Sequence, residues 1–559
     1  MHLIDWTILI GILLLIVVYG LWKSRAIVDS ESYLMGERRL KWWTIGLSVM
    51  ATQASAITFL STPGQAYEEG MGFAQFYFGL PLAMVLLCIF VLPVFYRLKV
   101  YTAYEFLEER FDLRTRVLTA MLFLLQRGLA AGITIFAPAI ILSTILGWSL
   151  FSTTLLIGAL VIVYTVSGGS EVVSQTQQQQ MIVILLGMAV AFVVILHKLP
   201  ESVGMSEALS LAGKMDKLEI VNFEFNLKEK YNIWSALLGG TFLFLSYFGT
   251  DQSQVQRYLS GKSLTESRLG LLFNGLFKVP MQFMVLLVGL MVFIFYQFNT
   301  SPLHFNTANV ALIKNSSLKK EYLALEDSLQ QIQKEKTSAI HSLLLSEKNN
   351  LTEVPEWRFF VNDLSARERA LRHEARKLIE TYNRKNEAKL EPADTDYVFI
   401  HFIMTQLPVG LIGLLLAVIF SAAMSTTASE LNALATTSVI DIYKRNFVPD
   451  ADDAHYLKAS KLFTVLWGVL ALGFAMAASL FENLIEAVNI IGSLFYGSIL
   501  GIFVLAFFLK KVKGSHIFKA ALLGEFVVLA LFAMNHYGVI DLAYLWLNMI
   551  GCLVVVGLA

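Results

Sequence analysis

The sequence is poor in charge and in cysteine. Charged residues make up only 15% of its 559 residues, against about 25% in a typical soluble chain, and 43 basic side chains balance 43 acidic ones. A net charge of zero gives no bulk attraction to nucleic acid. The two cysteines, Cys88 and Cys552, lie in apolar runs, so neither a disulfide framework nor a cysteine-based zinc site is predicted. These shortages argue against a cytosolic enzyme and a nucleic-acid-binding protein.

Long apolar runs take the place of the missing charges, and 56% of the residues are hydrophobic. A helix that crosses a lipid bilayer needs about 20 such residues, and an open strand could not satisfy its backbone there. The first run follows no basic signal region, so we expect it to stay in the protein as a membrane span. The sequence therefore predicts an all-α polytopic membrane protein. About 13 spans fit the pattern, near residues 4–22, 42–62, 72–96, 116–143, 146–166, 178–197, 232–252, 268–297, 408–440, 458–481, 485–509, 516–534 and 541–558.

Basic residues in the short loops indicate the orientation of these spans. They follow the first, third, seventh, ninth and eleventh spans, beginning at Lys23, Arg97, Arg257, Lys444 and Lys510. All five loops fall on one side of the membrane, and Lys and Arg favour the cytoplasmic side. We expect a protein of the plasma membrane, or of the inner membrane in a bacterium, with its N-terminus outside and its C-terminus inside.

One segment, residues 300–396, departs from the apolar pattern. It holds 30 of the 86 charged residues, 15 basic and 15 acidic. Leucines near helical spacing predict two amphipathic helices joined near Val354-Pro355, outside the membrane. The segment could be a solvated helical hairpin that covers the outer face, or a docking module for a protein partner.

Polar residues at membrane depth are the first candidates for function, because they are costly there. They gather in the second span, at residues 51–64, and in the ninth, at residues 421–429. Runs of small residues can simply pack helices closely. Hydroxyls beside an interrupted helix can instead bind a hard cation such as Na⁺. Spans two to six and seven to eleven begin on opposite sides, as an inverted repeat requires. No metalloprotease or serine-hydrolase motif occurs in the spans, so we do not expect an enzyme.

Three stretches, residues 102–111, 250–260 and 432–443, resemble the sodium/solute symporter family. The resemblance implies a LeuT-like fold of two inverted five-helix repeats with flanking helices, which transports by alternating access. It implies a first flanking helix and loop in residues 1–41, and the first repeat in 42–198. The second repeat would begin in 199–299, be interrupted by the charged insert in 300–396, and continue in 397–510. Residues 511–559 would form the C-terminal flanking helices.

The resemblance also implies a site for Na⁺, the co-transported ion. Its ligands would be the hydroxyls of Ser425 and Thr426 and the backbone carbonyls of Ala51, Ala54 and Ala422. Some members of the family have a second sodium site. The matching positions here are Ala428, Ser429 and Gln177, which lack one hydroxyl and the carboxylate, so we expect one Na⁺ per transport cycle.

Two cations lie inside the spans. Arg127 could be a counter-charge to an anionic solute, or it could extend to the inner headgroups. Lys278 is expected to be a paired or snorkelled side chain rather than a ligand. By resemblance, the solute-binding residues are Ser55, Thr58, Phe73, Tyr77, Tyr247, Phe248 and Asn489, with Arg127 added as a candidate.

The function that these features predict is sodium-coupled import of a small organic solute, and a carboxylate or sugar acid would suit Arg127. The partners would be the solute, Na⁺ and the lipid bilayer, without nucleic acid. A proton-coupled transporter of the same fold and a transporter-like sensor stay open as alternatives.

Overall fold

The computed structural model covers the whole chain and describes all of it except residues 25–32, 34–38, 350–352, 389 and 477–482. Over the described residues it is helical, and the only β pairing there is an isolated bridge between Leu40 and Gly261. Eight of the described helices are long and apolar enough to cross a membrane, and a bent pair can form a ninth span. Four shorter apolar helices are also described. Together these helices coincide with the predicted spans, which confirms the fold class.

The helices fall into a first set before residue 200 and a second set after it. The first set consists of α1 (Leu3–Ser24), α3 (Trp42–Gln53), α4 (Ala56–Glu69), η1 (Met71–Phe78), α5 (Gly79–Leu86), η2 (Leu87–Val91), α6 (Leu92–Leu98), α7 (Glu105–Arg110), α8 (Leu113–Leu146) and α9 (Leu150–His197). The second set begins with α10 (Met205–Lys214), η3 (Ser235–Gly240), α11 (Thr241–Gly249), α12 (Gln252–Leu259) and α13 (Leu264–Phe298). It ends with α17 (Val398–Gln406), α18 (Leu411–Thr437), η5 (Ser438–Tyr443), α19 (Lys444–Asn446), α20 (Asp453–Ala475), α21 (Leu484–Phe508), α22 (Gly514–His536) and α23 (Leu545–Leu558).

The helix α9 accounts for two of the predicted spans. The hydroxyl of Tyr164 lies 2.9 Å from that of Thr176. Twelve residues of straight helix would place these positions about 18 Å apart, which two side chains cannot bridge. The chain is therefore bent sharply between them, and the two parts of α9 correspond to the spans predicted at 146–166 and 178–197.

The bent pair of helices, α3 and α4, lies in the middle of the bundle. The two axes differ by 60°. The break falls at Ala54 and Ser55, where Ser55 has extended backbone angles (φ −76°, ψ 175°). A helix that ends here leaves carbonyls of its last turn without helical partners. The interruption that the polar second span predicted is thus present, and α18 packs against both halves of it.

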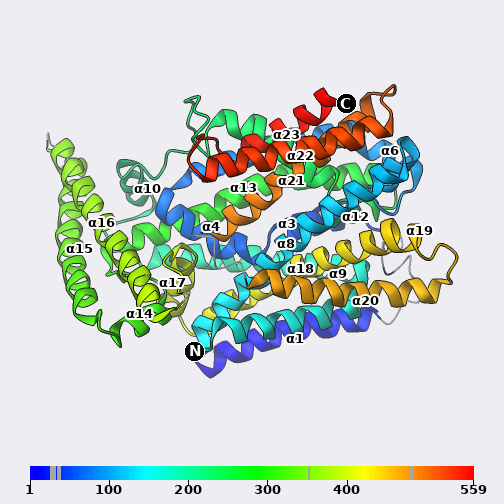
Figure 1. Cartoon of the computed structure of the whole chain (residues 1–559). Helices are drawn as coiled ribbons and strands as arrows, with labels where there is room; N and C mark the ends of the chain where they lie inside the picture. Colours follow the sequence, from blue (N-terminus) through cyan, green and yellow to red (C-terminus); the bar gives the residue numbers. More distant parts are fainter. Residues whose placement is uncertain (25–32, 34–38, 350–352, 389, 477–482) are drawn as a thin grey trace.

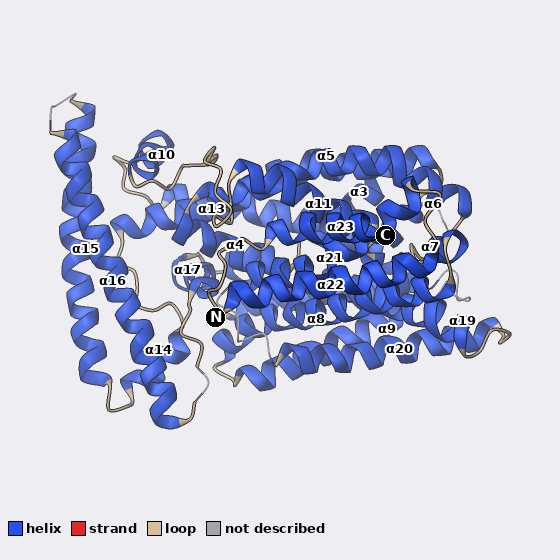
Figure 2. Cartoon of the chain, turned by 45° about the horizontal axis from the view of Figure 1, so that its top comes forward, coloured by secondary structure: helices blue, strands red, loops and turns tan. Residues whose placement is uncertain are grey.

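The charged insert projects from one end of the bundle (Figures 1 and 2). It contains α14 (Thr307–Lys314), α15 (Lys319–Lys348) and α16 (Val354–Asn386), and η4 (Thr395–Tyr397) leads back to the bundle. The helices α15 and α16 lie side by side and form the two-helix hairpin that the sequence predicted. A small core of its own, which includes Tyr322, Leu329 and Ile379, stabilises it. The N-terminus lies toward this end, whereas α6 and α19 lie at the opposite end.

Candidate functional site

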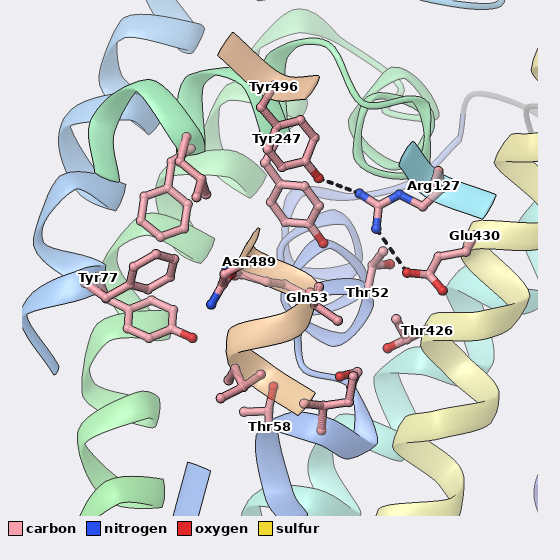
Figure 3. Close-up of a pocket in the computed structure, with 17 residues that line it drawn as sticks. Thr52, Gln53, Thr58, Tyr77, Arg127, Tyr247, Thr426, Glu430, Asn489 and Tyr496 are labelled. Carbon is pink, nitrogen blue, oxygen red and sulfur yellow. Dashed lines mark hydrogen bonds and ion pairs between the residues drawn. The ribbon is translucent and has the colours of Figure 1, made fainter. Parts of the chain in front are cut away.

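A cavity of about 80 Å³, lined by both polar and apolar side chains, lies beside the break between α3 and α4. Side chains from η1, α8, α11, α18 and α21 complete its wall (Figure 3). Six of the eight predicted solute-binding residues line it: Ser55, Thr58, Tyr77, Arg127, Tyr247 and Asn489. We call this space the central cavity.

The other two predicted residues lie behind the wall of the central cavity. The ring of Phe73 stacks on Phe76, with centroids 5.4 Å apart. The ring of Phe248 meets that of Tyr247 edge-on at 4.8 Å. Both side chains are buried, so they support the residues that face the cavity rather than lining it themselves.

The predicted sodium ligands come from α3, from Ala54 directly after it, and from α18, which packs against α3. The hydroxyl of Thr426 donates to the carbonyl of Ala51 across 3.3 Å. The hydroxyl of Ser425 is buried and has no hydrogen-bond partner among the described residues. An unpartnered buried oxygen is costly unless a ligand completes it. Neutral oxygens from a broken helix and a neighbouring one are a suitable set for Na⁺ as transported substrate.

Gln177 lies where the resemblance would place a second sodium site. Its amide nitrogen donates to the hydroxyls of Thr52 (3.0 Å) and Ser429 (2.8 Å), and its amide oxygen accepts from Ser48 at 2.5 Å. One neutral amide therefore joins α3, α9 and α18. The hydroxyl of Ser429 is already occupied as an acceptor in this arrangement. The geometry thus agrees with the expectation of a single Na⁺, which stays a prediction.

Arg127 of α8 is the centre of a buried ionic network that includes Asp251 at the start of α12, Glu430 of α18 and Tyr496 of α21. Its guanidinium forms ion pairs with Asp251 and with Glu430, the latter at 3.0 Å, and donates to the hydroxyl of Tyr496 at 2.7 Å (Figure 3). All four residues are buried. The alternative that Arg127 extends to the headgroups is therefore wrong. The network holds one cation and two carboxylates, so with both ionised it carries one excess negative charge.

Sequence reasoning did not assign Asp251 or Glu430 to the site. A carboxylate in the hydroxyl-rich run of the ninth span is a signal for function, because a charge at membrane depth needs a partner. The sequence carried that signal for Glu430. It could not show that Glu430 forms an ion pair with Arg127, because the two residues are 303 positions apart along the chain.

Lys278 is fully buried in α13, and its ammonium has no hydrogen-bond partner among the described residues. It lies 5.9 Å from the ring centroid of Tyr77, which lines the central cavity. The expectation of a paired or snorkelled lysine is therefore wrong. Lys278 is instead a buried cation directly behind the cavity wall.

A helix broken in mid-bundle and a small cavity beside the break, lined in part by polar side chains, are typical of a secondary transporter. A channel would need a continuous polar path, and an enzyme would need a converging set of catalytic groups. Comparison with known proteins gives the particular family. The sequence matches the model of the Sodium:solute symporter family over residues 33–317 and 385–524. The chain belongs to this family of sodium-coupled membrane transporters, which are not enzymes.

Three similar proteins illustrate the range of the family. The sodium-coupled monocarboxylate transporter 1 of Mus musculus is 28% identical over 502 residues, which are 89% of this chain and 68% of that one. The sodium/iodide cotransporter of Homo sapiens is 31% identical over 282 residues, 50% of this chain and 43% of that one. A sodium/sialic acid symporter of Proteus mirabilis is 25% identical, covering 99% of this chain and 93% of that one.

A solved structure of a Na⁺-coupled sialic acid symporter, in a substrate-bound outward-open state, shares the fold. Its TM-score is 0.74 at 24% sequence identity, and the match covers 99% of this chain and 96% of the other. The LeuT-like architecture is thereby established for the whole chain.

Proposed function

We propose that the protein imports a small carboxylate together with one Na⁺. The observation that carries this proposal is a pair of unused donors on residues that line the central cavity. The amide nitrogen of Asn489 and the Nε of Arg127 are buried and have no partner among the described residues. Figure 3 shows the Asn489 nitrogen directed toward Tyr77 across the cavity. The oxygens of a carboxylate are acceptors that would satisfy such donors.

The names of similar proteins also favour an anionic solute. The similar proteins named above are named for monocarboxylate, iodide and sialic acid, all of them anions.

The ion would couple to the solute by joining α3 to α18. Na⁺ bound between the Ala51 carbonyl and the hydroxyls of Ser425 and Thr426 would stabilise the conformation in which these helices are in contact. Its charge would also balance the excess negative charge of the Arg127 network. One charge that moves across 100 mV is worth about 2.3 kcal/mol, which would drive uptake. We place the N-terminus and the hairpin outside the cell and the α6 and α19 end inside, on the basis of the basic loops.

Uptake into proteoliposomes tests the proposal. Radiolabelled lactate, pyruvate, sialic acid, iodide and glucose would be compared under an inward Na⁺ gradient, with choline as the control cation. We expect accumulation of lactate or pyruvate that requires Na⁺. The variant Asn489→Ala should raise the KM for the carboxylate about tenfold by removing a hydrogen bond to a charged group. Preferred uptake of glucose, or uptake driven equally by a proton gradient in choline, would refute the proposal.

A further inference from the structure

A second and larger cavity, of about 590 Å³, lies where the helical hairpin meets the bundle. We call it the hairpin cavity. It is bounded by the end of α4, the loop after α10, α13 and one face of α16. Thr58 of α4 lines the central cavity and Tyr67 lines the hairpin cavity. Nine residues of α-helix separate the two positions by about 14 Å. The two cavities therefore lie about two and a half helical turns apart along α4.

The wall of the hairpin cavity carries an excess of positive charge. Its five Lys and Arg residues face three carboxylates, which leaves two positive charges in excess with His373 neutral. Three of the arginines lie on one face of α16, because residues spaced by three and four meet on the same side of a helix. The cations are Lys217, Lys336, Arg369, Arg372 and Arg376, and the acids are Glu68, Asp216 and Glu368.

Two of the cations are fully engaged within the protein. Lys336 and Arg372 both form ion pairs with Glu368. Burial alone would raise the pKa of Glu368, but these two cations lower it to about 2. Arg372 also donates to the hydroxyl of Ser301 at 2.6 Å and to the carbonyl of Pro302 at 2.8 Å. These residues hold the hairpin together and are not available to a ligand.

The other three cations keep capacity for a ligand. Arg369 is exposed and forms no hydrogen bond or ion pair with the described residues. Arg376 pairs with Glu68 and, at 3.0 Å, with Asp394, so only its Nε, which is buried without a partner among the described residues, stays available. Lys217 donates to the backbone carbonyl of Glu68, and its ammonium lies 5.0 Å from the ring centroid of Phe293.

Lys217 and Arg369 also repel each other. Burial lowers the pKa of Lys217 to about 8, and repulsion from Arg369 acts in the same direction. Glu68 and Glu69 act in the opposite direction and only partly offset the two effects, since the pKa stays lowered. An anion bound beside Lys217 and Arg369 would reduce their repulsion. The cavity is therefore arranged to bind a negative charge.

We propose that the hairpin cavity is a second anion site, in which Lys217, Arg369 and Arg376 bind the carboxylate before it enters the central cavity. The identity of the anion rests on the proposed function. A basic cleft raises the local concentration of an anionic solute and its rate of encounter. The charge-dense insert would thereby serve capture of the solute, rather than only covering the bundle.

Equilibrium binding of radiolabelled lactate to the purified full-length protein tests this site, in choline buffer without Na⁺. Arg369→Gln and the double variant Lys217→Gln/Arg369→Gln should weaken this binding about tenfold, as loss of bonds to a charged ligand does. The variants should also raise the KM for uptake without lowering the maximal rate. Arg367→Gln is the matched control, because Arg367 lies on the same helix but pairs with Asp363 outside the cavity. Unchanged binding in the double variant would overturn the proposal.

A pH series gives an independent readout of Lys217. Its ammonium faces Glu68 and Glu69 of α4, Lys336 of α15 and Arg369 of α16. The sodium-free binding of lactate should fall as the pH rises through about 8, because the ammonium loses its proton. Lys217→Arg should remove this fall, since arginine stays protonated. The same decline in the arginine variant would show that Lys217 is not a ligand.

The proposed transport of a carboxylate and the proposed anion site in the hairpin cavity can be refuted independently of each other. Preferred uptake of glucose would refute the carboxylate as transported solute, yet lactate would still bind without Na⁺ and in an Arg369-dependent manner. Na⁺-driven lactate uptake that Arg369→Gln leaves unchanged, with no binding in choline, would refute the hairpin cavity alone.

Discussion

Replacement of Arg127 by glutamine tests the buried network that joins α8, the start of α12 and α18. The Nη1 of Arg127 lies 3.0 Å from the carboxylate of Glu430, and at an effective dielectric constant of about 20 two unit charges at this distance interact with about 5–6 kcal/mol. Asp251 forms a second ion pair with the same guanidinium. Loss of the cation would leave two buried carboxylates without a counter-charge. Since removal of one partner of a buried pair costs about 3–5 kcal/mol, we expect Arg127→Gln to destabilise the protein by that amount.

A double-mutant cycle separates the charge effect from loss of packing. Thermal unfolding in detergent would be measured for the parent, Arg127→Gln, Glu430→Gln and the double variant. The double variant returns the network to a single excess negative charge, so it should be less destabilised than the sum of the two single changes. Equality with that sum would refute the account of a coupled ionic network.

Three further changes test other parts of the molecule. Gln177→Leu should lower stability by about 1–3 kcal/mol, because it leaves buried hydroxyls of α3 and α18 unpaired, and an unchanged melting temperature would contradict this. The Na⁺ dependence of initial uptake by the parent should fit a Hill coefficient near 1, whereas a value near 2 would indicate a second ion. Lys278→Met should raise the melting temperature, because it removes a buried amino group that has no hydrogen-bond partner among the described residues. Lower stability in that variant would show that the lysine makes a favourable interaction.

The positions of the membrane helices could be predicted because an apolar run long enough to cross a bilayer must satisfy its own backbone hydrogen bonds, which a helix does. An interruption of the second span was predicted from its small and polar residues, which end in Pro63 and Gly64, but the break falls earlier, at Ala54 and Ser55, and Pro63 lies inside α4. The two helices of the insert followed from leucine spacing. The docking of the hairpin onto the bundle did not, because it depends on pairs such as Arg376 with Glu68, which are 308 residues apart.

The central cavity was predicted less completely than the fold. Resemblance identified positions on the right helices, but it could not distinguish residues that line the cavity from a second layer behind them. Phe73 and Phe248 lie within one turn of residues that line the cavity, and only packing shows that their rings contact Phe76 and Tyr247 instead of the cavity. The partners of Arg127 were missed because an ion pair between distant helices leaves no periodic pattern in the sequence.

Thermal stabilisation by Na⁺ tests the central claim most directly. Purified protein would be melted in NaCl and in choline chloride of equal strength. Ten times the Kd of Na⁺ should add about 1.4 kcal/mol to the stability of the parent. The variant Ser425→Ala/Thr426→Ala should show no Na⁺-dependent shift, whereas the control Thr427→Ala, on the same buried stretch of α18, should keep it. Absence of a shift in the parent, or an equal shift in the double variant, would contradict a sodium site between α3 and α18.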